Sequence, residues 1–126
     1  GEGELEEVIL PCPGEVLLPG LRVSCVPAEE VINTPDAFTV SAVGTIRIRC
    51  RKSGDSIRLS GGSKSLKKLF IDRKIPAAQR QRIPVLCDGE GILAVHTIGI
   101  NQDRAGEGPG RIQIQIEEMK MRMEEK

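Results

Sequence analysis

The sequence predicts an α+β fold, in which an antiparallel sheet or a pair of sheets is built from short strands with two short helices inserted between them. Three observations lead to this prediction. Apolar and polar residues alternate at 46–50 and 112–116, as in strands with one buried face. Prolines and glycines divide the first 36 residues into short segments. Residues 63–70 instead carry apolar side chains at helical spacing.

The length of 126 residues fits one domain, or one domain with part of a neighbour. We expect residues 1–36 to form acidic N-terminal strands or a linker, and they could also end a preceding domain. A main domain over 37–117 and a tail over 118–126 complete the division. In the tail the apolar residues shift to odd positions, namely Met119, Met121 and Met123. This shift predicts either a bulge or the end of the last strand.

Residues 37–52 end in a clean alternation that predicts a half-buried strand with a cationic exposed side. Its apolar face would carry Ile46, Ile48 and Cys50, and its exposed face Arg47, Arg49 and Arg51. A turn at 53–55 and a second short strand at 56–60 follow.

A glycine pair at 61–62 ends that strand, and a helix is predicted after it, with Ser63 or Ser65 as its N-cap. At 100° per residue, one helix face collects Leu66, Leu69 and Phe70, and the opposite face collects Lys64, Lys67 and Lys68.

A second short helix is expected between Pro76 and Pro84, because proline suits a first helical turn and restricts the residue before it. Arg80 and Arg82 would lie in this helix. Residues 85–87 and 92–97 then read as a hairpin around the turn "DGEG". The last strand would point Ile112, Ile114 and Ile116 to one side.

The net charge of zero conceals a strong asymmetry along the chain. Residues 1–36 hold eight acids and one base, and residues 37–104 hold thirteen bases and five acids. Residues 105–126 hold four bases and five acids, so the three sums of −7, +8 and −1 cancel. Within 47–82 there are twelve bases and two acids. Such a segment can attract an anion that the average charge would not, although a charge run can also serve solubility alone.

The cysteines and the single histidine predict neither a metal site nor a catalytic centre. No C-x-x-C pair is present, and His96 has no partner at metal-ligand spacing. Cys50 and Cys87 are predicted to be small core residues. No apolar run approaches the length of a membrane helix and the first residues are acidic, so we expect a cytoplasmic protein without membrane contact.

The stretch "RLSGGSKSLKKLF" at 58–70 allows two interpretations. A glycine turn before a helix suits phosphate, and "SGGSKS" approaches the S-G-G-x-D-S loop of ATP pyrophosphatases. Lys64 stands where that loop has its aspartate, so nothing at this position would hold magnesium. Alternatively, the cations bind a polyanion through its phosphates. Because the chain has only two aromatic residues, a structured RNA held through its backbone is expected rather than stacked bases.

Residues 54–100 closely resemble the C-terminal domain of tRNA(Ile)-lysidine synthetase. The matching features, in order, are Gly54–Asp55, Arg58, Gly61–Gly62, "SLKKLF" at 65–70, "KIP" at 74–76, "RQRIP" at 80–84 and Asp88–Gly89. Members often carry aromatic residues where this chain has Ala94 and residues 101–104.

The resemblance implies a domain that grips tRNA, within an enzyme that uses ATP to attach lysine to an anticodon cytidine of an isoleucine tRNA. ATP and magnesium would belong to an N-terminal catalytic domain of the same polypeptide, so this chain is expected to hold no cofactor and to be inactive alone. The expected RNA contacts are Arg58, Lys64, Lys67, Lys68, Arg73, Lys74, Arg80 and Arg82. Two other hypotheses remain: a docking module that uses the same basic face on an acidic segment, and a small ATP-dependent enzyme.

Overall fold

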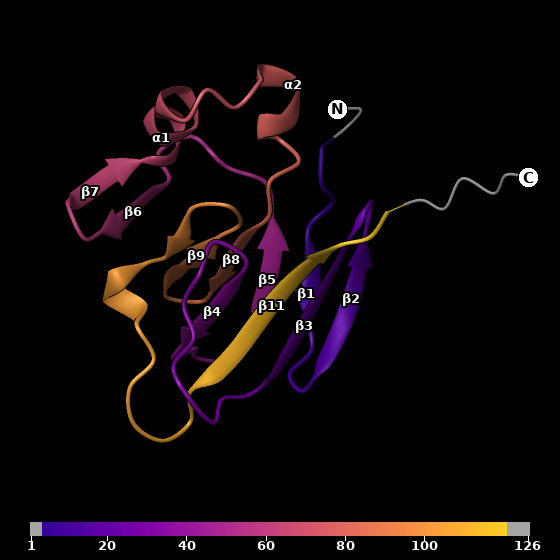
Figure 1. Ribbon diagram of the computed structural model, residues 1–126, viewed down its shortest axis with the longest axis vertical. Coiled ribbons are helices and arrows are strands. Elements are labelled where there is room, and N and C mark those ends of the chain that lie inside the picture. Colours follow the sequence, from indigo (N-terminus) through magenta and orange to yellow (C-terminus); the bar gives the residue numbers. More distant parts are fainter. Residues whose placement is uncertain (1–3, 121–126) are drawn as a thin grey trace, which may run out of the picture.

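The computed structural model describes residues 4–120, which form two larger antiparallel sheets and one small one (Figure 1). The five-stranded sheet has the order β1-β5-β8-β9-β10. Its strands are β1 (Val8–Leu10), β5 (Ile46–Arg49), β8 (Val85–Asp88), β9 (Gly91–Val95) and β10 (Gly99–Ile100). The hairpin predicted around "DGEG" is therefore present as β8 and β9, and its second strand ends at Val95 rather than at residue 97.

The four-stranded sheet has the order β2-β3-β11-β4. Its strands are β2 (Gly14–Leu18), β3 (Leu21–Pro27), β11 (Ile112–Glu118) and β4 (Ala37–Val40). Residues 37–52 thus form two strands in two different sheets, where the sequence suggested one strand. The last strand ends at Glu118, and Met121 and Met123 lie outside the described residues.

Between β5 and β8 the chain forms a separate unit at one end of the molecule (Figure 1). It consists of the two-stranded sheet β6 (Ser56–Leu59) and β7 (Gly62–Ser65), followed by α1 (Leu66–Asp72) and α2 (Ala77–Arg80). We call residues 56–82 the insert, and the two larger sheets the body. The body also carries the 3-10 helix η1 (Gln102–Arg104).

Two hydrophobic clusters hold these parts together. The first lies between the two larger sheets and includes Phe38, Val23 and Ile114 from one sheet and Ile48 and Leu86 from the other. The second lies between the insert and the opposite face of the five-stranded sheet, and contains Ile57, Leu66, Leu69, Phe70, Ile83, Val85, Ile92, Val95 and Ile98. The five-stranded sheet is therefore covered on both faces where the insert packs, and the helices are short compared with the sheets.

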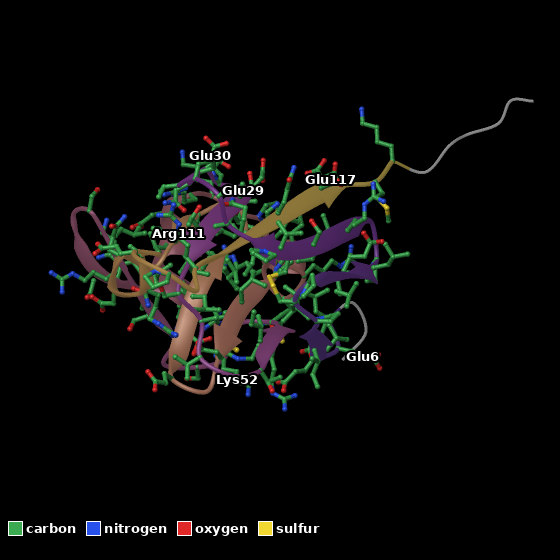
Figure 2. The ribbon with its side chains drawn as sticks, turned by 90° about the horizontal axis from the view of Figure 1, so that it is seen from below. Glu6, Glu29, Glu30, Lys52, Arg111 and Glu117 are labelled. Carbon is green, nitrogen blue, oxygen red and sulfur yellow. A yellow bond between two sulfur atoms is a disulfide. The ribbon has the colours of Figure 1, made fainter. Side chains whose placement is uncertain are left out.

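The acidic first segment contributes strands to both larger sheets. β1 pairs with β5, and β3 pairs with β11 over seven residues. Its glutamates lie at the surface: Glu29 and Glu30 stand on the same side of the molecule as Glu117, and Lys52 stands on the opposite side (Figure 2). The segment before residue 37 is thus structurally integrated with the strands that follow.

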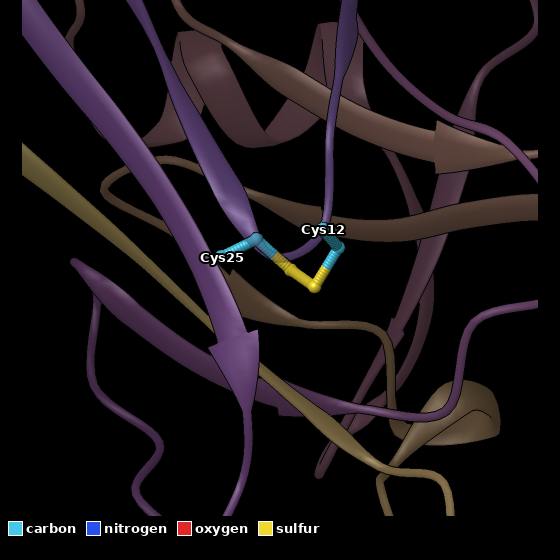
Figure 3. The surroundings of a disulfide bond; sticks show 2 residues. All are labelled: Cys12 and Cys25. Carbon is cyan, nitrogen blue, oxygen red and sulfur yellow. A yellow bond between two sulfur atoms is a disulfide. The ribbon is translucent and has the colours of Figure 1, made fainter.

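A disulfide joins Cys12, in the loop after β1, to Cys25 in β3 (Figure 3). The sequence did not predict this bond, because a separation of thirteen residues has no diagnostic meaning without the fold. Of the two remaining cysteines, Cys87 is buried as predicted, whereas Cys50 follows the end of β5 and is only half-buried. Within residues 4–120, no helix has the length and apolar character needed to cross a membrane.

Candidate nucleic-acid interface

Helix α1 presents the face that the sequence predicts. Ser65 is its N-cap, and the Ser65 hydroxyl accepts a hydrogen bond from the Lys68 N–H at 3.1 Å. Leu66, Leu69 and Phe70 are buried, whereas Lys67 and Lys68 are exposed. A local 3.6-residue period therefore fixed both the packing face and the cationic face of this helix.

Lys64 does not belong to α1, which corrects the prediction of one helical stripe. The chain turns at Ser60 and Gly61 and returns as β7, where Lys64 pairs with Ile57 of β6. Gly62 makes this return possible with a φ of +118°, which residues with a side chain rarely adopt. Ser63 is accordingly in a strand and is not a helix cap.

Lys64, Lys67 and Lys68 nevertheless lie within five residues across the junction of β7 and α1. All three are exposed, and none forms an ion pair or a side-chain hydrogen bond within the described part of the chain. The three ammonium groups are thus available to an external anion.

The segment between the two helices uses some of its cations internally. Arg73 is the C-cap of α1, and its Nη1 donates to the Thr97 carbonyl at 3.4 Å. The Arg80 Nε donates to the Ile75 carbonyl at 2.8 Å, so this side chain closes the loop before α2. Arg82 lies two residues beyond the end of α2 rather than inside it, because the helix ends before the Ile83–Pro84 step.

Arg58 of β6 forms an ion pair with the body. Its Nη1 lies 3.5 Å from the Asp103 carboxylate of η1, and both side chains are about 60% exposed. The backbone N–H of Arg58 also donates to Asn101 at 3.3 Å. Asn101 therefore links β6 to η1.

The cationic face predicted for residues 47–51 is largely neutralised. Arg49 binds the Asp55 carboxylate at 2.8 Å, with both side chains nearly buried, and exposed Arg47 lies 3.7 Å from Glu7. Burial alone would raise the pKa of Asp55, but hydrogen bonds from Arg49 and the Lys52 N–H outweigh it and lower that pKa below its usual value. Arg49 therefore stabilises the turn after β5, whereas Arg47 contacts the segment before β1.

A second buried pair, which the sequence did not indicate, joins Arg104 to Asp88 at the β8–β9 turn. The Asp88 side chain is fully buried and also accepts from the Val43 N–H at 2.8 Å and the Glu90 N–H at 2.9 Å. Burial would raise the Asp88 pKa, yet the Arg104 hydrogen bond and these two N–H groups lower it. The two residues are 16 apart in sequence, so only the fold brings them together.

The described residues offer phosphate contacts but no base-stacking rings. Phe38 and Phe70 are both fully buried, the His96 ring is also buried, and the chain has no Tyr or Trp. Within residues 4–120, His, Cys, Asp and Glu side chains do not gather in a group of three that could hold a metal ion. The arrangement can therefore bind an anionic backbone through ammonium groups and backbone N–H donors.

Comparisons with known proteins support the family that the sequence suggested. The family described as "TilS substrate C-terminal domain" matches residues 46–116. The tRNA(Ile)-lysidine synthase of Clostridioides difficile is 44% identical over 72 residues, which cover 56% of this chain and 16% of that protein. The enzyme of the same name from Bacillus subtilis is 46% identical over 48 residues, which cover 36% of this chain and 10% of that protein.

A solved structure is similar over nearly the whole chain. "Crystal structure of TILS C-terminal domain" superposes with a TM-score of 0.79 at 30% identity, and covers 94% of this chain and 100% of that one. The alignments with the two enzymes span only about a sixth or less of their length. The similarity thus concerns one domain of a larger protein.

Proposed function

The chain belongs to the TilS substrate C-terminal domain family, and from this premise we propose that it binds tRNA through the sugar-phosphate backbone. The exposed lysines at the junction of β7 and α1 carry this proposal. Phosphate contacts position an RNA without reading its sequence, and they require only cations and N–H donors at the surface. Lys64, Lys67 and Lys68 meet that requirement because no carboxylate in residues 4–120 neutralises them.

The remaining predicted contacts lie in the same insert. Lys74 is exposed and follows α1. Arg73 and Arg80 each donate a hydrogen bond from one guanidinium nitrogen to a backbone carbonyl, and their other N–H groups remain for phosphate. Arg58 would contribute once a phosphate competes with Asp103. Arg82 is exposed beside α2.

In the whole protein, we propose that this domain holds the tRNA while another part of the same polypeptide attaches lysine to the anticodon cytidine. The relatives are named tRNA(Ile)-lysidine synthases, and the aligned part is a small fraction of them. ATP and magnesium would bind in that other part. The protein would then act in the cytoplasm, where tRNA is modified.

A triple substitution tests the RNA interface. Lys64→Ala, Lys67→Ala and Lys68→Ala together should weaken tRNA binding on the order of 100-fold at 0.1 M salt, because each lost phosphate contact removes about 0.9 from the salt slope. Affinities measured by fluorescence anisotropy across a salt series give both quantities. Thermal stability should change little, since the three side chains form no ion pair or hydrogen bond with residues 4–120.

The matched control removes the same charge from the body, by Arg22→Ala, Arg111→Ala and Lys120→Ala. These residues lie along β11 and its neighbours, and this variant should bind tRNA within about threefold of the parent. If the lysine variant binds as the parent does, or if both variants lose binding equally, the interface is wrongly assigned.

A docking module is the second candidate function, and the contact between Arg47 and Glu7 favours it. This contact joins the basic segment to the acidic one. The three lysines, however, take no part in this contact. A gel-shift titration with tRNA separates the two candidates, because a docking module would give no shift at low salt.

A further inference from the structure

A cavity of about 330 Å³ lies beside the basic surface, where the insert meets β10 and η1. Its walls come from the β6–β7 turn, the end of α1, β10, η1 and the loop 33–35. Its volume falls at the lower end of the range for small-ligand sites. We propose that this cavity receives one unpaired nucleotide of the bound RNA, an inference that rests on the proposed function.

The lining combines an apolar wall with polar side chains, two of which have no internal partner. Leu59, Ile98 and Ile100 form the apolar part, and the two isoleucines are no more than 8% exposed. The Ser60 hydroxyl and the Gln102 amide also line the cavity, and neither forms a side-chain hydrogen bond with any residue in 4–120. A nucleobase requires this combination, because it has an apolar face and a polar edge.

Arg73 supplies the group that can replace an aromatic platform. Unpaired bases stack on aromatic rings or on guanidinium planes, and both phenylalanines are fully buried. Arg73 lines the cavity and is exposed, and its Nη1 is directed to the Thr97 carbonyl at 3.4 Å. This contact leaves the other guanidinium nitrogens and the plane of the group for a ligand.

The residue after Arg73 and the residue that accepts its hydrogen bond both have a backbone conformation that is uncommon for residues with a side chain. Lys74, the next residue, has a φ of +59°, and Thr97, which accepts the Arg73 hydrogen bond, has a φ of +71°. They are the only non-glycine residues with positive φ among the described residues. At Lys74 this conformation ends α1, because the Lys74 and Ile75 N–H groups donate to the Ile71 and Phe70 carbonyls. The two positions therefore fix the backbone from which Arg73 reaches the cavity and the carbonyl that holds its guanidinium.

The position of the cavity explains why the ligand should belong to an RNA. Lys74 follows Arg73 directly, and α1 carries Lys67 and Lys68. A strand whose phosphates contact these cations would pass the mouth of the cavity, and an unpaired nucleotide could place its base inside. The lysines would provide affinity for any duplex, and the cavity would add preference for an RNA with an unpaired position.

Three RNAs that share one duplex test this inference: a blunt duplex, the same duplex with an unpaired 3′ end, and the same duplex with one bulged nucleotide. The parent chain should bind at least one of the unpaired forms about tenfold more tightly than the blunt form, as expected for one stacked base. The form that gains affinity identifies whether the nucleotide comes from an end or from a bulge.

Two variants assign the gain to the cavity. Arg73→Lys retains the charge but removes the guanidinium plane, so it should bind the unpaired forms no more tightly than the blunt duplex, which abolishes the tenfold preference. Gln102→Ala should reduce the preference, whereas Gln115→Ala, an exposed glutamine of β11, should preserve it.

Equal affinity of the parent chain for all three RNAs would overturn the cavity assignment and leave the proposed function intact. Failure to bind any of them at low salt would overturn both. If Arg73→Lys kept the full preference, the guanidinium plane would not be the platform, and the inference would fail on that point.

Discussion

The body and the insert use their charged residues in opposite ways. In the body, four arginines are paired with carboxylates: Arg104 with buried Asp88, Arg49 with Asp55, Arg22 with Glu117 and Arg47 with Glu7. In the insert, Lys64, Lys67, Lys68 and Lys74 are exposed and form no ion pair with residues 4–120. Paired arginines therefore stabilise the body, whereas the lysines of the insert remain available to an anion.

This difference follows from where each charge lies relative to a hydrophobic cluster. Asp88 and Arg104 lie beside the tightly packed body, where an unpaired charge would be costly. The lysines lie on the solvent side of α1, whose opposite face fills the second cluster. An unpaired but hydrated ammonium group costs little free energy there, so the lysines remain available to bind a polyanion.

The largest effect is expected from Asp88→Asn. This substitution leaves the Arg104 guanidinium, only 13% exposed, without a counter-charge, and should lower the free energy of unfolding by about 4 kcal/mol. Urea denaturation measures the loss. Glu117→Gln is the control, because it breaks a half-exposed pair and should cost less than about 1 kcal/mol. Equal losses in the two variants would contradict the distinction between buried and surface pairs.

The dependence of stability on acid pH gives an independent measure of the Asp88–Arg104 pair. The pKa values of Asp55 and Asp88 are lowered in the folded protein, so the unfolded chain binds more protons and acid favours unfolding. Their contribution is complete above the unfolded value of about 3.9 and is lost as the pH falls through the lower folded pKa. Asp88→Asn should therefore lose less stability between pH 5 and 3 than the parent does.

The next largest effect should distinguish the two hydrophobic clusters. Leu69→Ala in the insert and Ile114→Ala in the body each remove a buried aliphatic side chain and should cost about 3 kcal/mol. Only Leu69→Ala should also weaken tRNA binding by the folded protein, because Leu69 anchors the helix that carries Lys67 and Lys68. Calorimetry for stability and anisotropy for binding separate the two results. Equal binding by both variants would show that the lysines act without a fixed helix.

The sequence predicted those features that depend on neighbouring residues. The buried and exposed faces of α1, the cap at Ser65 and the hairpin at Asp88–Gly91 follow from local periods and turn residues. The β7 strand was missed because a glycine pair can precede a helix as readily as it can form a hairpin turn. Lys64 was consequently assigned to the wrong element, although its exposure was predicted.

Long-range pairings escaped sequence reasoning for a different reason. Arg58 and Asp103 are 45 residues apart, and Cys12 and Cys25 pair only because β3 passes the loop after β1. The cavity likewise combines residues from the loop 33–35, the insert and β10. Of its lining, only Arg73 stood out in the sequence, as a basic residue near others.

A smaller effect is expected from the disulfide. Cys12→Ser opens a loop whose ends are 13 residues apart in sequence and should lower the unfolding free energy by about 2 to 3 kcal/mol under oxidising conditions. Affinity for tRNA should not change, since the bond lies in the body. The parent protein in excess reductant should match the variant in urea denaturation. If the fully folded variant bound tRNA more weakly than the parent, the conformation of the body would influence the RNA interface.

The smallest effect should come from Asp103→Asn, which turns a paired cation of the insert into an available one. The Arg58–Asp103 pair is about 60% exposed on both sides, so its loss should change stability by less than about 1 kcal/mol. Without the Asp103 carboxylate, Arg58 can contact a phosphate. The affinity for tRNA should then rise a few-fold at 0.1 M salt, and the salt slope should become steeper by up to about 0.9. Glu107→Gln, an exposed acid in the loop before β11, removes the same charge away from Arg58 and should give no comparable gain. If both variants strengthen binding equally, the gain reflects net charge alone, and the pairing of Arg58 does not limit the interface.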